Sequence, residues 1–273
     1  MVNKTNPKAK FWLIPEFHNL ELLRAQKIHY QYARHSHPTY SIGIIEEGVG
    51  GNFYRGSTYL APPKSLVLMN PEEVHTGYSA EELPLTYRML YPASDFLKGI
   101  ADHVSCQKGI PYFPDGVIQN QKSAKQVLEL HKTLEFSQDF LTKESILIEV
   151  LSALLVHYAE IKLQLPRLGK ETQAVCLIKE YLQANFSSQI SLDQLVKITN
   201  LNRFYLIRVF RQAVGMPPYT YLNQIRIRKA KALLVQGYAI AEVANAVGMS
   251  DQSHLNRHFK KIVGVTPGQY CSR

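Results

Sequence analysis

The sequence predicts an α+β protein that joins an N-terminal antiparallel β-barrel with following helices to a C-terminal all-α domain with two helix-turn-helix units. Two observations favour this fold class. Residues 28–91 contain short runs rich in Tyr, Ile and Val, separated by Gly, Pro, Asn and Glu, which is typical of a small antiparallel barrel or sandwich. The C-terminal part follows helical spacing instead, and it repeats itself with a period of 49 residues.

Composition indicates a globular chain. Its 273 residues, 45% hydrophobic and 19% charged, suffice for two domains, which we place at 1–164 and 165–273 with the boundary in "LPRLGKE". The N-terminus shows no secretion signal, and the most apolar run, "ILIEVLSALLVHYAEI", is too short and too polar to span a bilayer. We therefore expect a cytoplasmic protein with no membrane partner. The spacing of Cys106, Cys176 and Cys271 predicts neither a disulfide framework nor a metal-binding pair.

The expected barrel strands are the runs "IHYQY", "YSIGIIE", "NFYRGSTYL", "SLVLM" and "LTYRMLY". Two helical segments follow within residues 121–164. Their apolar positions are Val127, Leu130 and Leu134 in the first segment, and Ile146, Ile148, Val150, Leu151, Leu154, Leu155 and Tyr158 in the second. Because the second segment is apolar over more than one face, packing on the barrel and self-association into a homodimer are both open.

The two C-terminal repeat units share the frame L-x-R-x-F-x4-G-x2-P-x2-Y. The matching pairs are Leu206 with Leu255, Arg208 with Arg257, Phe210 with Phe259, Gly215 with Gly264, Pro218 with Pro267, and Tyr221 with Tyr270. A short helical segment, "SLDQLVKITN" or "AIAEVANAVG", precedes each unit. A chance likeness of two helices would match apolar positions only. The matched charge and turn residues therefore indicate a helix, a tight turn and a helix, twice over.

Helical geometry predicts which side chains of the repeat face outward. At about 100° per residue, Arg257 stands about 200° away from the buried position Leu255, and Arg208 holds the same place in the first unit. The residues that flank these two arginines are Ser253, Lys260, Phe204 and Arg211. Each second helix is therefore expected to show one arginine at the centre of an outward face.

A linking helix and a basic charge accompany the repeat. Residues 218–236 predict a helix about 28 Å long, at about 1.5 Å per residue, and successive major grooves on one face of B-DNA lie roughly 34 Å apart. Residues 165–273 hold 15 Lys and Arg against 5 Asp and Glu. The basic residues of the linking helix, which suit phosphate contacts or solvation, are Arg226, Arg228, Lys229 and Lys231. This charge distribution is typical of a polyanion binder, and the length of the helix would allow two recognition helices to enter adjacent major grooves of double-stranded DNA.

Residues 170–271, with "SLDQLVKITNLNRFYLIRVFRQAVGMPPYTYLNQIRIRKAKALL" and "AIAEVANAVGMSDQSHLNRHFKKIVGVTPGQY", resemble the DNA-binding domain of AraC/XylS-type transcriptional regulators. The resemblance implies that the second helix of each unit reads the major groove. The implied readers are Arg203, Phe204, Ile207 and Arg208 in the first helix, and Gln252, Ser253, His254, Asn256 and Arg257 in the second. Lys260 is expected to contact phosphate. We interpret Asp251, at the start of the second helix, as an N-cap.

Residues 15–95, with "HSHPTYSIGIIEEGVGGNFYRGSTYLAPPKSLVLMNPEEVHTG", resemble the cupin-like effector-binding domain that often accompanies this DNA-binding domain. His35 and His37 would share one strand face near His75, so a three-histidine metal site is geometrically conceivable. Metal-holding cupin enzymes place a glutamate a few residues after the H-x-H pair, where this chain has Ile42 and Gly43. We therefore expect no metal and no cofactor. The expected effector-binding residues are His35, His37, Tyr40, Tyr54, His75 and Arg88.

The resulting hypothesis is a sequence-specific DNA-binding transcriptional regulator, not an enzyme, that responds to a small-molecule effector bound in the barrel. Two alternatives stay open: a metal-dependent cupin enzyme fused to a DNA-binding domain, and an N-terminal domain used only for dimerisation. No Ser-His-Asp order, P-loop or dinucleotide-binding glycine motif supports other chemistry. Activation of transcription would add a contact with RNA polymerase, which composition does not reveal.

Overall fold

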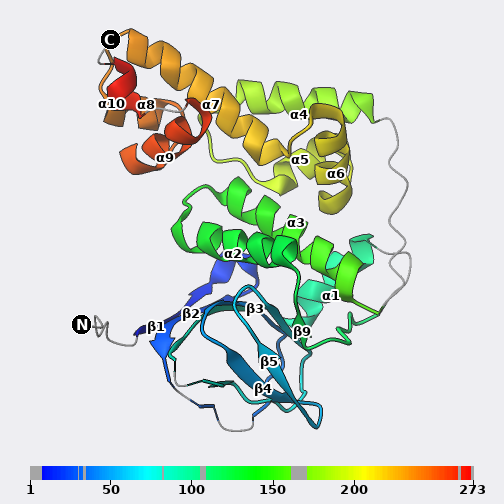
Figure 1. The fold of residues 1–273 in the computed structure, drawn as a ribbon. Helices are drawn as coiled ribbons and strands as arrows, with labels where there is room; N and C mark the ends of the chain where they lie inside the picture. The colour runs from blue at the N-terminus through cyan, green and yellow to red at the C-terminus, as the bar shows by residue number, and fades with distance from the viewer. Residues whose placement is uncertain are drawn as a thin grey trace, which may run out of the picture. The chain divides into compact units, whose positions relative to one another are not determined.

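The computed structural model describes residues 8–29, 31–32, 35–81, 83–104, 109–160, 171–263 and 266–271. The chain forms two compact units (Figure 1). The first contains Met1–Lys132 with Val150–Leu165, and the second contains Thr133–Glu149 with Pro166–Arg273. The expected boundary between residues 164 and 165 lies outside the described residues, as do Cys106 and Gly264.

The strands of the first unit form two antiparallel sheets. The larger sheet has the order β1-β2-β8-β3-β6-β9, and the smaller has the order β5-β4-β7. The strands are β1 (Lys8–Ile14), β2 (Leu20–Ile28), β3 (Ser41–Glu47), β4 (Gly50–Tyr54), β5 (Ser57–Ala61), β6 (Leu66–Met69), β7 (Tyr78–Ser79), β8 (Leu85–Tyr91) and β9 (Val117–Ile118). A short 3-10 helix, Pro15–Phe17, connects β1 to β2.

Both sheets contribute to one hydrophobic core. Val67 and Met89 of the larger sheet and Tyr54 and Ala61 of the smaller belong to the same buried cluster. Burying apolar side chains from two facing sheets is what holds such an architecture together, at about 25 cal/mol for each Å² of apolar surface removed from water. The shared core confirms the expected antiparallel barrel or sandwich.

The strands and helices of the first unit differ from the expectation at several places. The run "IHYQY" is not a strand, because β2 ends at Ile28 and the following described residues lie outside any strand. Strands β1 and β2 precede the region in which strands were expected, and α1 (Ser94–Val104) was not expected. Strand β1 lies at the edge of the larger sheet and is mostly exposed, so its sequence carries little of the apolar alternation that marks a half-buried strand.

The two helical segments expected within residues 121–164 are confirmed as α2 (Gln121–Phe136) and α3 (Phe140–Tyr158). The apolar residues of α3 that are buried within the chain include Ile148, Val150, Leu151, Leu154 and Leu155. These side chains are buried in the chain, and self-association through α3 stays a prediction.

The described part of the second unit is helical from residue 172 onward. Besides the parts of α2 and α3 within Thr133–Glu149, its helices are α4 (Thr172–Ala184), α5 (Leu192–Thr199), α6 (Arg203–Val214), α7 (Pro218–Val235), α8 (Ile240–Ala246), α9 (Gln252–Val263) and α10 (Pro267–Cys271). The pairs α5–α6 and α8–α9 confirm the two helix-turn-helix units, and α7 confirms the linking helix (Figure 1). Within the described ranges, no helix combines the length and the apolar character needed to cross a bilayer.

Polar caps fix the starts of α6 and α9. The Asn202 side-chain oxygen accepts a hydrogen bond from the backbone N–H of Tyr205 at 2.8 Å. An Asp251 carboxylate oxygen accepts one from the backbone N–H of His254 at 2.7 Å, which confirms the N-cap interpretation. Helix α6 ends at Gly215, whose φ of 82° lies in the left-handed region that favours glycine.

Candidate functional site

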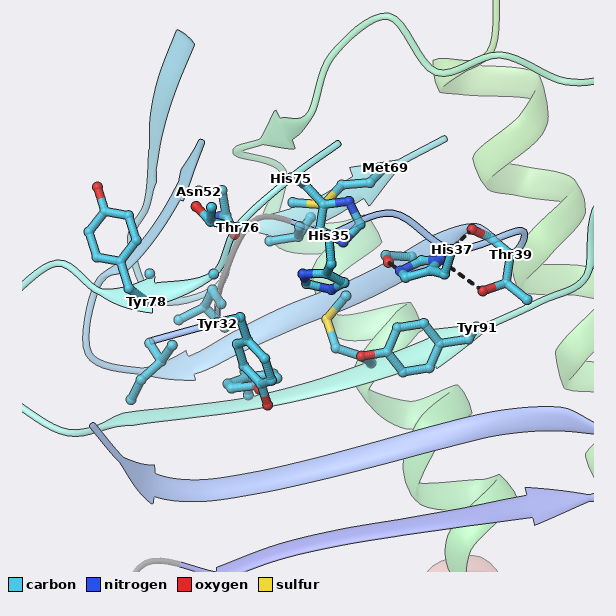
Figure 2. A pocket seen from close by; sticks show the side chains of 18 of the residues that line it. Tyr32, His35, His37, Thr39, Asn52, Met69, His75, Thr76, Tyr78 and Tyr91 are labelled. Carbon is cyan, nitrogen blue, oxygen red and sulfur yellow. Dashed lines mark hydrogen bonds between the residues drawn. The ribbon is translucent and has the colours of Figure 1, made fainter. Parts of the chain in front are cut away.

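The first unit contains a cavity of about 460 Å³ lined by residues of both sheets (Figure 2). Its apolar wall comes mainly from the larger sheet, including Ile45, Val67 and Met89, while Asn52 comes from the smaller sheet. Three histidines, His35, His37 and His75, lie at one side of it. A mostly apolar cavity with a few convergent polar groups is the usual form of a small-molecule site.

The three histidines form one cluster. The ring centroids of His35 and His75 are 4.4 Å apart, and those of His37 and His75 are 4.9 Å apart. The segments that carry His35 and His75 are joined by two backbone hydrogen bonds, from His35 N to the His75 carbonyl at 3.0 Å and from His75 N to the His35 carbonyl at 2.9 Å. The structure thus brings together the three histidines that the sequence had suggested as neighbours.

The environment favours neutral imidazoles in this cluster. Burial lowers the pKa of His75 and the pKa of His37, because a charged ring is poorly solvated there. The His75 Nδ1 donates to the carbonyl of Glu73 at 2.8 Å, which leaves its Nε2 lone pair for a ligand. A neutral imidazole can accept a hydrogen bond or bind a metal ion, and a protonated one can do neither.

Three tyrosines that were not among the expected effector-binding residues, Tyr32, Tyr87 and Tyr91, contribute further polar groups to the cavity. The hydroxyl groups of Tyr32 and Tyr87 are hydrogen-bonded at 2.9 Å, and Tyr91 stands with its ring 5.6 Å from that of His37. Burial raises the pKa of Tyr87 and of Tyr91, so both hydroxyls stay protonated. Figure 2 shows Tyr32 and Tyr91 beside the histidines.

Three expected effector-binding residues, Tyr40, Tyr54 and Arg88, are not among the described residues that line this cavity. Strand alternation explains two of them. Ser41 and Ile45 of β3 and Tyr87 and Met89 of β8 line the cavity, so Tyr40 and Arg88, each one position away, belong to the opposite faces. The expectation that Tyr40 and Arg88 line the cavity was therefore wrong by one residue along the chain.

These three residues have structural partners instead. Arg88 is buried and pairs through Nε with a Glu46 carboxylate oxygen at 2.7 Å. The Tyr54 hydroxyl bonds to the carboxylate of Glu73, and burial raises the pKa of Tyr54 to about 12. Tyr40 is buried and its hydroxyl donates to the Pro111 carbonyl. Such bonds satisfy polar groups that have lost contact with water.

In the second unit, α9 presents the polar face that the repeat predicted. Gln252, Ser253, Arg257 and Lys260 are exposed, and Asn256 is half-buried. The apolar residues Leu255 and Phe259 face the opposite way, into a core shared with α7 and α8. Among the described residues, none forms an ion pair with Arg257. Its side chain is exposed.

Helix α6 differs from the expectation that each second helix shows an outward face for DNA contact. Phe204 is only 8% exposed and Ile207 only 3%, so neither side chain forms part of an outward face. Arg203 pairs with Asp193 of α5 at 2.6 Å. Arg208 is half-buried, with its guanidinium carbon 5.3 Å from the centre of the Phe204 ring. In α6, Phe204 and Ile207 are buried in addition to Leu206 and Phe210, the apolar positions that the repeat frame identified.

Two further residues are corrected by their burial. His254, an implied base reader, is 2% exposed and lies against the ring of His258 at 4.6 Å between centroids. Arg226, expected at the surface of the linking helix, is 1% exposed and donates to the carbonyls of Phe186 at 2.8 Å and Ser188 at 2.9 Å. Both side chains are therefore buried inside the unit.

A unit with two helix-turn-helix copies and an outward basic helix face, attached to a unit with a ligand-sized cavity, defines a ligand-binding DNA-binding regulator. Family models support this class. Residues 17–151 match the model described as "AraC-like ligand binding domain", and residues 195–273 match a "Helix-turn-helix domain". The chain belongs to the AraC family of DNA-binding transcriptional regulators.

Two known relatives resemble the chain over most of its length, and a solved domain resembles a smaller part of it. It is 30% identical over 252 residues to the HTH-type transcriptional regulator YbfI of Bacillus subtilis, covering 92% of this chain and 90% of that protein. It is 26% identical over 248 residues to the transcriptional activator RhaS of Pectobacterium atrosepticum, covering 86% of each. The solved C-terminal domain of the response regulator AraT of Geobacillus stearothermophilus is 32% identical, covers 39% of this chain and 88% of its own, and has a TM-score of 0.36.

Proposed function

We propose that helix α9 reads base edges in the DNA major groove, with Arg257 as its principal base-contacting residue. The supporting observation is the exposed face of α9, where Arg257 stands among Gln252, Ser253 and Lys260. Within the described ranges no acidic side chain pairs with Arg257. An arginine can donate two parallel hydrogen bonds to guanine, and the amide of a glutamine can do the same to adenine. Lys260, farther along the helix, is assigned to the phosphate backbone.

The first unit of the repeat is assigned a different part in binding. Since Phe204 and Ile207 are buried, Arg203 and Arg208 are the implied readers of α6 that are left for groove contacts. Arg203 would first exchange Asp193, at 2.6 Å, and Glu144, at 3.6 Å, for DNA. Helix α7 has 18 residues, which gives a length of about 27 Å at about 1.5 Å per residue. That spacing is compatible with contacts one turn of duplex apart, roughly 34 Å.

The cavity of the first unit is the proposed effector site. Its polar groups, His35, His37, His75, Asn52 and Tyr32, would orient a small molecule against the apolar wall. Residues 1–164 are the proposed effector-binding domain, and residues 165–273 the DNA-binding domain. The protein is proposed to act in the cytoplasm without enzymatic activity. A homodimer and a contact with RNA polymerase remain predictions, and the buried α3 side chains give no support to dimerisation through that helix.

Paired substitutions test the assignment of α9. Arg257→Ala is expected to cost about 1 to 3 kcal/mol on the preferred sequence, because a bidentate base contact is lost, and to relax the preference at one base position. Lys260→Ala should weaken binding to all sequences alike and reduce the slope of log affinity against log salt by about 1. Binding of the full chain would be measured by fluorescence anisotropy at several salt concentrations.

The two variants serve as controls for each other, since both remove one exposed positive charge from the same helix. The reference ligand is a DNA sequence selected from a random pool, and the comparison ligand is its shuffled version. If Arg257→Ala weakens binding to both DNAs equally, Arg257 contacts phosphate and the proposed reading of bases by α9 is wrong.

A further inference from the structure

We propose that His35, His37 and His75 together bind one divalent transition-metal ion, with its remaining coordination positions open to the cavity. The inference goes beyond the proposed function, which needs only a small-molecule effector. It also reverses the expectation of no metal that followed from Ile42 and Gly43, because the three histidines lie together in the structure. It places a positive charge at a defined point of the effector site and thereby indicates the chemistry of the effector.

The first support is the distance between donor atoms. One nitrogen from each of the three rings lies within 4.8 Å of the other two. A metal ion that binds imidazoles at about 2.1 Å holds any two of their nitrogens no more than about 4.2 Å apart. In a tetrahedral site two such nitrogens lie about 3.4 Å apart, so a pair at the 4.8 Å limit would close by about 1.4 Å. Rotation of the exposed His35 and the half-buried His37 would provide that movement.

The second support is the orientation of two rings by groups behind them. A backbone carbonyl can only accept, so His75 Nδ1 donates to Glu73 and His37 Nδ1 donates to Thr39 at 2.9 Å. Each bond fixes the tautomer that leaves the Nε2 lone pair for a ligand. Figure 2 shows the Thr39 contact on the side of His37 turned away from the other two histidines. Metal-binding histidines almost always have such a partner on the other ring nitrogen.

The His37 Nε2 has a competing partner. Ser41 Oγ lies 3.1 Å from it and donates to it in this tautomer. Binding of an ion would exchange that hydrogen bond for a metal–nitrogen bond, and the Ser41 hydroxyl would rotate. A single neutral hydrogen bond contributes only about 1 kcal/mol net, which is small beside the affinity of a three-imidazole site for a transition metal.

The donor set selects the class of ion. Three neutral imidazoles suit zinc, copper, nickel, cobalt or iron, whereas magnesium and calcium need carboxylate and carbonyl oxygens. The ligands contribute no negative charge of their own, so the bound ion keeps its full double positive charge. An effector with an anionic oxygen donor, such as a carboxylate or a hydroxy acid, would then fill an open position and lie against the apolar wall.

Direct metal binding by the full chain tests this inference. The protein would be prepared without a histidine tag, stripped with a chelator and titrated with Co2+ and Zn2+. We expect one ion per chain, with visible d–d absorption of the cobalt form. His35→Gln and His37→Gln should each weaken binding by more than about 100-fold, since even the loss of an outer partner of a ligand costs about 10- to 100-fold. The control is His157→Gln, which changes an exposed histidine of α3.

Three results would overturn the inference: no binding of either ion, equal binding by wild type and the two cluster variants, or equal weakening by His157→Gln. A variant that fails to fold would show a lowered melting temperature of the metal-free chain. His35→Gln was chosen because His35 is exposed, so its replacement should leave the fold intact. DNA binding by the stripped chain is measured in parallel. If the chain binds DNA but no metal, only the metal inference is refuted. If the chain binds metal but no DNA, only the proposed function is refuted.

Discussion

At the scale of single residues, a basic side chain on a helix can be buried and stabilise the fold, or be exposed and available to a ligand. Helix α7 carries Arg226 and Arg228 two positions apart, and phosphate contact or solvation was expected of both. The structure buries Arg226, which donates to two backbone carbonyls and pairs with Asp139 of the same unit at 3.2 Å, while Arg228 is exposed. Burial of a charge requires such partners.

Replacing each arginine by methionine separates these roles. Arg226→Met is expected to destabilise the protein by about 3 to 5 kcal/mol, because it leaves Asp139 buried without a counter-charge. Arg228→Met, the matched control on the same helix, should change stability by no more than about 0.5 kcal/mol. Urea unfolding of the full chain, followed by circular dichroism, measures both. Equal stability of the two variants would contradict the structural role of Arg226.

At the scale of elements, the helices of the second unit were predictable because their signals are local. Apolar spacing places the buried face of α9, and Asp251 places its start. Prediction of the cavity failed where it depended on strand parity, as Tyr40 and Arg88 show, since a shift of one residue exchanges the two faces of a sheet. Tyr32 lies in a loop without periodicity, and its place beside the cavity results from tertiary packing.

The cap of α9 gives a test at this scale. Asp251 accepts from the backbone N–H of His254, and this bond lowers the pKa of the Asp251 carboxyl. Asp251→Ala should destabilise the protein by about 1 kcal/mol, whereas Asp251→Asn, which can also cap, should lose less. The midpoint of urea unfolding of the full chain provides the comparison. A cap role is contradicted if alanine and asparagine shift the midpoint equally.

At the scale of the whole molecule, the division into a β unit with a cavity and a helical unit with a basic face was visible in the sequence, from the strand-like runs and the 49-residue repeat. The different exposure of α6 and α9 could not be predicted from the sequence. The repeat pairs Arg208 with Arg257 by position alone and does not show how deeply their neighbours are buried. In the structure α9 exposes its polar face and α6 buries Phe204 and Ile207. We therefore expect the α9 contacts to carry most of the sequence preference.

The most direct measurement is selection of bound sequences from random DNA by the full chain, carried out with wild type and with Arg257→Ala. The account predicts one strongly enriched element that Arg257→Ala relaxes at a single base position, with a weaker element about 10 base pairs away that stays unchanged. Enrichment of no sequence at all, or the same enriched element in both proteins, would contradict it.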